Sequence, residues 1–319
     1  MRVLVTGANG ALGRGTVRAL AAKGHEVLGL VKDPAKADIV TQAGGKAVVG
    51  NLEDDKTYDF AKDVDAIVHT AQADYYRKRV TPGLTEKVGA LDLKWTRKLI
   101  AAGAGRAKVF VYTSTAFVYG DNGDTLVDET TPLHTYRFAG WKVEGEKVAL
   151  EEAKKAGYAS AIVVRPGMVY SEYVERGFFG HGILGPLLNG KPTGYLGKGD
   201  QWTSIIHEED LGALYAAAVE KQPGFTVFNA IDDEPVKHAV YLPVLTQALG
   251  SKKAMGFPKL AVFMLMGRYA LEVFAGNLRI SNKKARAELG WKPKYPTYRE
   301  GMAAVAAALG QQGLLRKAS

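Results

Sequence analysis

The chain opens with the stretch Met1-Arg2-Val3-Leu4-Val5-Thr6-Gly7-Ala8-Asn9-Gly10-Ala11-Leu12-Gly13, which decides the fold. Its apolar residues 3–5 predict a short strand buried on both faces, and residues 14–23 predict a helix with one apolar side. Three glycines, Gly7, Gly10 and Gly13, form the turn between them. Such a turn lets a pyrophosphate approach the backbone, where the helix N-terminus offers free N–H groups. We therefore predict a dinucleotide-binding turn rather than a purely structural one.

Further strands follow, separated by helical segments and without hairpin signals. We predict strands at 25–31, 46–49, 65–69, 108–113 and 159–164, and a long helix at 85–102. This alternation predicts an α/β fold of the Rossmann type, a doubly wound parallel sheet with helices on both faces. Ligands of such sheets bind beyond the carboxyl ends of the strands. In this chain those ends carry Gly7, Asn51, Thr70, Ser114 and Arg165.

The end of the second strand bears on which coenzyme binds. Sites selective for NAD place an acidic residue there, which binds the adenosine ribose. This chain instead has Val31 followed by Lys32, and Arg14 could reach the same region. Two cations at this place favour the 2′-phosphate of NADP. We expect NADP, with NAD as the alternative if Asp33 takes the acidic role.

The composition narrows the class of protein. With 319 residues and 47% hydrophobic content, the chain can form one large α/β domain, alone or with a small lobe. The net charge of +9 comes from scattered Lys and Arg, and the densest run, at 76–79, is short. This distribution favours a solvated basic surface, which also suits anionic cofactors, over nucleic-acid binding. The absence of cysteine excludes thiol catalysis, disulfides and thiolate metal sites.

Targeting signals are also missing from the sequence. No signal peptide precedes the first strand, and the most apolar tract, 260–266, is too short to span a bilayer. We therefore expect a cytoplasmic protein with a small-molecule substrate, no metal, no nucleic-acid partner and no membrane partner.

Three later motifs make the chain resemble a known family. They are Thr113-Ser114-Thr115-Ala116-Phe117-Val118-Tyr119-Gly120, Arg165-Pro166-Gly167-Met168-Val169-Tyr170 and Lys283-Lys284-Ala285-Arg286-Ala287-Glu288-Leu289-Gly290-Trp291-Lys292-Pro293. With the glycine turn, they resemble the extended short-chain dehydrogenase/reductases, the NAD-dependent epimerase/dehydratase branch, over nearly the whole chain. The resemblance implies a Rossmann domain at 1–170 and a smaller mixed α/β substrate lobe at 171–319, with the chain crossing back near 203–228. It also implies a homodimer formed through the helices that begin near residues 85 and 136.

The resemblance implies a catalytic hydroxyl residue, a tyrosine and a lysine. The hydroxyl residue orients the substrate oxygen, the tyrosine exchanges its proton, and the lysine binds the nicotinamide ribose. Thr115 takes the hydroxyl position and Lys142 the lysine position, with Glu146 as the trailing acid. The expected coenzyme contacts are Gly7, Asn9, Gly10, Ala11, Leu12, Gly13, Arg14, Lys32, Asn51, Leu52, Thr70, Ala71, Gln72, Thr113, Lys142, Pro166, Gly167 and Met168.

The tyrosine is missing, because Phe138 stands four residues before Lys142. Phenylalanine keeps the ring but has no ionisable group, and general acid–base help is worth roughly 10²–10⁴ in rate. Six residues along a helix would turn Tyr136 away from Lys142, so Tyr136 is not a simple substitute. Three explanations stay open. The chain could be a deliberate Tyr-to-Phe variant. Phe138 could instead be native, in an enzyme that needs no proton donor or uses another one, such as Tyr119, Tyr136 or Glu172. The protein could also bind NADP without catalysing a reaction.

The sequence after Tyr170 predicts less. The glycine-rich aromatic stretch 177–182 predicts a flexible wall over the site, and helices are predicted at 236–249 and 259–274. We expect helix 259–274, which is apolar nearly all round, to be buried as core or as a substrate lid. Thr297 and Glu300 predict a capping box for the last helix. The candidate substrate contacts are Ser114, Tyr119, Tyr170, Phe179, His181 and Trp202.

The expected function is that of an NADP(H)-dependent oxidoreductase acting on a carbonyl or alcohol substrate. A nucleotide-sugar epimerase or dehydratase is one alternative. By the resemblance, such enzymes usually carry asparagine where Met168 stands, and arginines for a diphosphate; Arg176, Arg268 and Arg279 follow no clear pattern. A silent NADP-binding protein is the other alternative.

Overall fold

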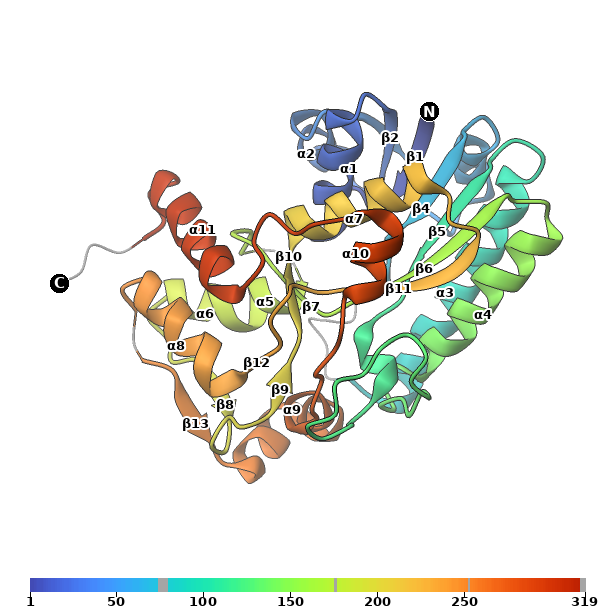
Figure 1. Ribbon diagram of the computed structural model, residues 1–319. Helices are drawn as coiled ribbons and strands as arrows, with labels where there is room; N and C mark the ends of the chain where they lie inside the picture. Colours follow the sequence, from blue (N-terminus) through green and yellow to red (C-terminus); the bar gives the residue numbers. More distant parts are fainter. Residues whose placement is uncertain (74–79, 175–176, 252, 316–319) are drawn as a thin grey trace.

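The computed structural model describes residues 1–73, 80–174, 177–251 and 253–315 (Figure 1). The basic run 76–79 and Arg176 lie outside these residues. The chain forms two connected parts, a large sheet covered by helices and a smaller lobe of short strands and helices. None of the helices in the described ranges is long and apolar enough to cross a membrane.

The large sheet has seven parallel strands in the order β11-β6-β5-β4-β1-β2-β3. Their bounds are β1 Arg2–Thr6, β2 Glu26–Val31, β3 Lys46–Val49, β4 Ala66–His69, β5 Val109–Thr113, β6 Ser160–Pro166 and β11 Phe225–Ala230. The central strands are fully buried apolar runs, as expected for strands covered on both faces. The Rossmann-type fold predicted from the sequence is confirmed.

Helices cover the two faces of the sheet, each with its own apolar core. One core joins α1 (Gly13–Ala22), α2 (Ala37–Gln42), α7 (Glu208–Lys221) and α10 (Lys283–Leu289) to the sheet. The other joins α3 (Pro82–Gly103), α4 (Gly140–Lys155) and the turn η2 (Asp55–Ala61) to it. Figure 1 shows α1 and α7 on one side of the strands and α3 and α4 on the other. Two short turns, η1 (Pro34–Lys36) and η3 (Ala116–Tyr119), follow β2 and β5.

The smaller lobe is built from three two-stranded pairings and several helices. The strand pairs are β7 (Met168–Tyr170) with β10 (Ile205–His207), β9 (Trp202–Thr203) with β12 (Val236–Lys237), and β8 (Gly194–Leu196) with β13 (Met255–Phe257). The helices are α5 (Gly177–Phe179), η4 (Gly180–Leu184), α6 (Gly185–Leu188), α8 (His238–Ala248), α9 (Lys259–Ala275) and α11 (Tyr298–Gln311). A third apolar core holds most of this lobe together. The predicted capping box of Thr297 and Glu300 at α11 is confirmed.

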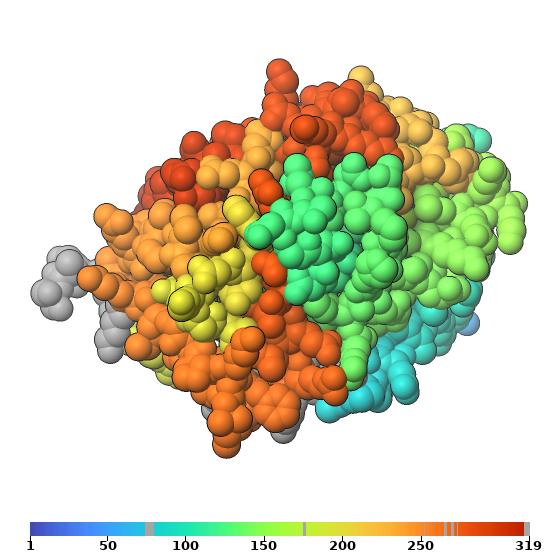
Figure 2. All heavy atoms as spheres, turned by 60° about the horizontal axis from the view of Figure 1, so that its bottom comes forward, coloured from blue at the N-terminus to red at the C-terminus, as the bar shows by residue number. Residues whose placement is uncertain are grey.

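The lobe and the large sheet meet along the loop that follows η3. The indole Nε1 of Trp202 donates to Asp124 Oδ1 at 2.5 Å, and Asn277 Nδ2 donates to Asp121 Oδ1 at 3.1 Å. Figure 2 shows this green loop lying between the orange lobe and the lighter green α4. The loop therefore connects the end of β5 to the substrate side of the molecule.

One prediction about the lobe is wrong. Helix α9 was expected to be buried, but Leu260 and Met264 are 68% and 71% exposed, and Phe263 is exposed as well. The helix is also interrupted, because Gly267 has φ 83° and ψ 178°. Uniform apolarity does not fix burial when the neighbouring elements, here β8 above all, cover only part of the helix surface.

Candidate functional site

The turn after β1 leaves no room for a side chain at two of its glycines. Gly7 has φ +65°, and a Cβ there would lie 2.7 Å from the Cα of Ala71 at the end of β4. A Cβ on Gly13 would lie 2.7 Å from the Cα of Ala8. Helix α1 begins here without a side-chain cap. The bare backbone and the uncapped helix N-terminus fit the pyrophosphate of a dinucleotide, which needs close backbone approach and free N–H donors.

At the tip of β2, Lys32 is exposed to solvent, and the Asp33 carboxylate binds a nearby backbone N–H. Lys32 is exposed, whereas Asp33 Oδ1 accepts a hydrogen bond from the N–H of Ala35 at 3.1 Å and so caps η1. Arg14 lies elsewhere, with its guanidinium 3.8 Å from the ring centre of Tyr173 after β7. Of the two cations expected at the 2′-phosphate, Lys32 is the one at the strand tip.

The expected contacts at the ends of β3 and β4 line the same edge of the sheet. Asn51 Oδ1 accepts from the N–H of Glu53, and Leu52 is buried. Thr70 Oγ1 donates to the carbonyl of Thr6 at 2.6 Å. Ala71 packs against Gly7, and Gln72 follows it. The contacts of Thr70 and Ala71 fix the backbone around the glycine turn.

Lys142 on α4 is held from two sides. Its Nζ donates to the carbonyl of Thr113 at 2.7 Å and to Asp92 Oδ1 at 3.2 Å, and the side chain is almost fully buried. The ammonium also lies over the rings of Tyr112 and Trp141, 4.7 and 4.4 Å from their centres. Burial lowers the pKa of Lys142, while Asp92 raises it. Asp92 also accepts from the Tyr112 hydroxyl at 2.5 Å, so this acid is a fixed anchor for Lys142.

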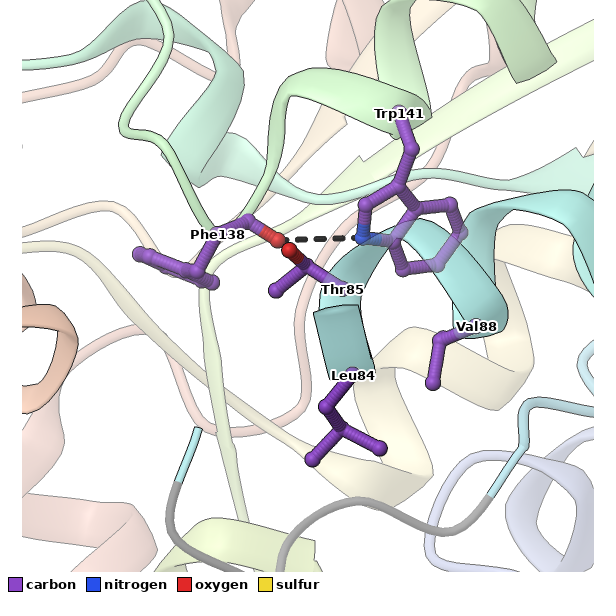
Figure 3. A pocket seen from close by; sticks show the side chains of 5 residues that line it. All are labelled: Leu84, Thr85, Val88, Phe138 and Trp141. Atoms are coloured by element: carbon purple, nitrogen blue, oxygen red, sulfur yellow. Dashed lines mark hydrogen bonds between the residues drawn. The ribbon is translucent and has the colours of Figure 1, made fainter. Parts of the chain in front are cut away.

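Phe138 precedes α4 rather than lying on it. We expected Phe138 and Lys142 to share one helix, but α4 begins at Gly140. The Trp141 Nε1 donates to the carbonyl of Phe138 at 3.0 Å, and the Phe138 ring points away from Trp141 (Figure 3). These two residues line a pocket with Leu84, Thr85 and Val88 of α3.

Tyr136 also lies outside α4, so the helical rotation that was expected to separate it from Lys142 does not apply. It stacks on Phe138 with ring centres 6.1 Å apart and an interplanar angle of 10°. Its hydroxyl packs against Gly276 after α9 and has no hydrogen-bond partner within the described ranges. Burial raises the pKa of Tyr136, and the charges of Asp121 and Glu272 raise it further. The phenol therefore faces the lobe.

Ser114 and Thr115 have different surroundings. The Ser114 hydroxyl donates to Glu146 Oε1 at 2.5 Å. Glu146, on α4, also receives two hydrogen bonds from Arg165, at 2.9 and 2.6 Å. Thr115 is half-buried and accepts only from the N–H of Phe117, at 3.4 Å, among the hydrogen bonds of the described residues. The Thr115 O–H is thus free to donate a hydrogen bond, whereas the Ser114 O–H already donates to the Glu146 carboxylate.

Tyr119 belongs to a buried network. Its hydroxyl accepts from Arg165 at 2.8 Å and donates to Asn229 Oδ1 at 2.9 Å. Burial raises the pKa of Tyr119 to about 12, although Arg165 and Asn229 oppose the shift. This phenol connects β6 to β11 and has no exposed surface for a substrate.

The remaining substrate candidates are dispersed. Tyr170 and Phe179 are fully buried, and their rings contact each other at 5.8 Å. His181 is exposed on η4. Trp202 lies between the cations of Lys237 and Arg279, 5.2 and 5.0 Å from its ring centre. The packing of Tyr170 and Phe179 suits them to the core of the lobe.

The segment after β6 passes close to a neighbouring strand. A Cβ on Gly167 would overlap the carbonyl of Ser204, and the N–H of Met168 donates to that carbonyl at 2.9 Å. The Met168 sulfur lies 4.0 Å from the Tyr241 hydroxyl. Pro166, Gly167 and Met168 therefore join the large sheet to the lobe at the expected coenzyme edge.

Sequence reasoning missed Asp92, which anchors Lys142. A signal for it existed, because Val88, Asp92, Trp95 and Leu99 follow helical spacing on the buried face of α3. A carboxylate among apolar positions of one helix face needs a partner. The partner comes from α4, fifty residues away in the chain, and could not be chosen from the sequence.

Comparison with known proteins gives one family for most of the chain. Residues 3–230 match the model of the NAD dependent epimerase/dehydratase family. A 3-diazoavenalumate denitrifying reductase of Streptomyces sp is 30% identical over 95% of this chain and 99% of that protein. A 4-hydroxy-2-methyl-3-oxo-4-farnesyl-3,4-dihydroquinoline-1-oxide ketoreductase of Stigmatella aurantiaca is 27% identical, with 96% of each chain covered. These relatives are similar over their whole length.

Solved structures show the same fold. The human epimerase family protein SDR39U1, determined with NADPH, matches with a TM-score of 0.79 at 22% identity. The match covers 96% of this chain and 99% of that one. The two parts of the molecule are therefore arranged as in that protein.

Proposed function

Because this chain belongs to the NAD dependent epimerase/dehydratase family, of the extended short-chain dehydrogenase/reductase type, we propose that it is an NADP(H)-dependent oxidoreductase. Its substrate is a small organic molecule, and the sequence favoured a carbonyl or an alcohol. Of the relatives, one is named for reduction of a diazo compound and another for reduction of a ketone. A diazo group and a ketone are therefore both candidate acceptors at this site.

The observation that carries the proposal is the turn between β1 and α1, where two glycines leave no room for a side chain. A Cβ at Gly7 or Gly13 would collide with backbone atoms, and α1 starts without a cap. A dinucleotide pyrophosphate uses both features. The Lys142 ammonium, fixed by Asp92 and the carbonyl of Thr113, supports the nicotinamide end of the same site.

Each group has a proposed role in the reaction. When bound, NADPH supplies the hydride. Lys142 binds the nicotinamide ribose, and Thr115 donates a hydrogen bond that orients the substrate. Ser114 can accept a hydrogen bond from the substrate but not donate one, because its O–H donates to Glu146. Phe138 provides a ring wall and no proton. Tyr119, Tyr170 and Phe179 are left out because they are buried.

The preference for NADP over NAD rests on Lys32. It is exposed at the tip of β2, while the neighbouring Asp33 caps η1. The human structure with NADPH supports the same choice. A charge-assisted hydrogen bond is worth about 1.5–3 kcal/mol, so losing it weakens binding by roughly ten- to a hundredfold.

Calorimetry with NADPH and NADH tests the function. We expect tighter binding of NADPH, and Lys32→Ser to weaken NADPH about tenfold while hardly changing NADH. Lys46→Ser is the matched control, because Lys46 is exposed at the opposite end of β3. Tighter NADH contradicts the coenzyme assignment, and no affinity for either coenzyme contradicts the function.

A further inference from the structure

Hydride addition to a neutral carbonyl leaves an alkoxide that needs a proton. A positioned acid is typically worth about 10²–10⁴ in rate. Phe138 cannot supply the proton, and the Trp141 indole is already bound to the Phe138 carbonyl. The chemistry of this site therefore depends on which other groups could act as the acid.

Four hydroxyl groups of the described residues lie near this site, and each has a feature that disqualifies it as the acid. Ser114 donates to Glu146, and Tyr119 donates to Asn229. The Tyr136 hydroxyl packs against Gly276 on the lobe side. Thr115 has a free proton, but an aliphatic hydroxyl is too weak an acid to give it up. None of these four hydroxyl groups thus combines an acidic proton with an accessible position, because the Tyr136 hydroxyl is itself buried.

The same region offers a surface for a positive charge. The rings of Phe117, Tyr136 and Phe138 are half-buried and contact one another, with centres 5.3 to 6.3 Å apart. Aromatic faces attract cations without hydrogen bonds. Asp121 and Glu272 lie close enough to act on the Tyr136 phenol, although Glu272 also pairs with Arg137 and Arg268.

Lys142 does not repel such a charge at full strength. Its ammonium lies 3.2 Å from Asp92 Oδ1, and both side chains are buried. The pair is close to neutral as seen from the aromatic rings, because opposite charges at this distance largely cancel farther away. The site therefore lacks the tyrosine acid, has a lysine whose charge is balanced by Asp92, and lies beside a cluster of three aromatic rings.

We propose that the site reduces electrophiles that already carry a positive charge on nitrogen, namely iminium or diazonium groups, in preference to neutral carbonyls. This inference rests on the proposed function. Because cationic acceptors need no proton from the protein, having phenylalanine at position 138 does not slow their reduction.

The electron count of both reactions closes without an acid. With an iminium, hydride forms a new C–H bond, the π pair of C=N⁺ moves to nitrogen, and a neutral amine leaves with NADP⁺. With an arenediazonium, hydride replaces N₂, so a C–N bond breaks, a C–H bond forms and NADP⁺ is produced. In each case NADPH is oxidised by two electrons and no further reactant is needed.

Two probes of matched shape test the proposal. N-methyl dihydroisoquinolinium is a permanent cation, and α-tetralone is a neutral ketone of similar bicyclic size. We expect kcat/KM with NADPH to be at least about a hundredfold higher for the cation. Phe138→Tyr should raise kcat/KM for α-tetralone by about a hundredfold or more and so narrow this ratio. Phe225→Tyr, the same change at an exposed residue of β11, should leave the ratio as it is.

Binding provides a readout that does not depend on turnover. Calorimetry should show tighter binding of the cation than of α-tetralone to the protein without coenzyme. Phe117→Leu keeps the apolar volume but removes a ring face, and should weaken the cation about three- to thirtyfold. Phe225→Leu is the control for this change.

The outcomes separate the two proposals. Failure to bind NADPH contradicts the proposed function. Normal NADPH binding with α-tetralone reduced at least as fast as the cation contradicts the inference alone. Normal NADPH binding with turnover of neither probe, or equal gains for both probes in Phe138→Tyr, also contradicts the inference.

Discussion

Glu208 is the first residue of α7, and its carboxyl group is buried. Only 1% of the residue is exposed, and neither oxygen has a hydrogen-bond partner among the described residues. The nearest cation, Arg18, lies 3.7 Å away, beyond hydrogen-bond distance. Burial therefore dominates and raises the pKa of Glu208 to about 8, with Glu172 adding to the shift. Folded protein holds this proton at neutral pH.

This proton makes stability depend on pH. The carboxyl ionises near 4.5 when unfolded and near 8 when folded. Folded protein binds more protons between these values, so stability is full below pH 4.5 and falls as pH rises towards 8. Glu208→Gln removes the ionisation. We predict that it stabilises the protein at pH 9, by on the order of 3 kcal/mol, and hardly at pH 5. Urea unfolding at both pH values measures this difference.

The neighbouring Glu209 serves as a control, because its substitution should change stability at high pH in the opposite direction. Burial raises its pKa, but the hydrogen bond and charge of Lys294 outweigh burial, and the net pKa is lowered. Its stabilisation is present at high pH and is lost on acidification. Glu209→Gln should therefore destabilise the protein at pH 9. A stabilising effect of both substitutions at pH 9 contradicts this explanation.

At the scale of elements, α1 and α7 touch through their backbones. A Cβ on Gly15 would lie 2.5 Å from the carbonyl oxygen of Glu208, and a Cβ on Gly212 would overlap the carbonyl of Gly15. No side chain separates the two helices at this point. The position of α1, and with it the coenzyme turn, is therefore set directly by α7.

Gly212→Ala tests this contact. Alanine is favoured over glycine inside a helix by up to about 1 kcal/mol. Here the added methyl group pushes α7 away from α1, and overpacking typically costs about 1–3 kcal/mol. We predict lower stability in urea and weaker NADPH binding. Gly83→Ala in the first turn of α3, where a Cβ meets no atom within 4 Å, should not destabilise. Unchanged NADPH affinity in Gly212→Ala contradicts the coupling.

The elements that the sequence predicted well are those with a local signal. The strands and the helices flanking them follow from apolar runs, from glycines and from the capping box of Thr297. The start of α4 was misplaced because the turn before it carries no cap, and so Phe138 was expected on the helix. Strand β11 lies at the edge of the large sheet beside β6, a pairing between distant segments that no local pattern specifies.

The residues of the site also divide into those with a local sequence signal and those placed by contacts between distant segments. The glycine turn could be found from its spacing, and Lys142 from its match to the family motif. The Asp92–Lys142 pair, the Glu146–Arg165 pair and the direction of the Tyr136 hydroxyl depend on contacts between elements distant in the sequence. These tertiary contacts decide which protons are free, and therefore they could not be predicted.

At the scale of the molecule, the family resemblance predicts a homodimer through α3 and α4. None of the large apolar side chains that are exposed in the described ranges lies on these two helices. The apolar side chains available to an interface there are partly buried ones such as Leu84, Leu91 and Trp141. We predict that Ala90→Arg, at an exposed position of α3, shifts the protein to monomer. Ala303→Arg on α11 should not, and sedimentation velocity distinguishes them. A monomeric parent protein contradicts the prediction.

The path of the chain between its two parts limits how the protein can be rebuilt. After β6 the chain enters the lobe, returns through α7 to place β11 in the large sheet, and then goes back for α8 and α9. A single cut cannot release either part intact. Exchanging substrate specificity with a relative therefore requires transplanting at least two separate inserts, with α7 and β11 kept from the recipient.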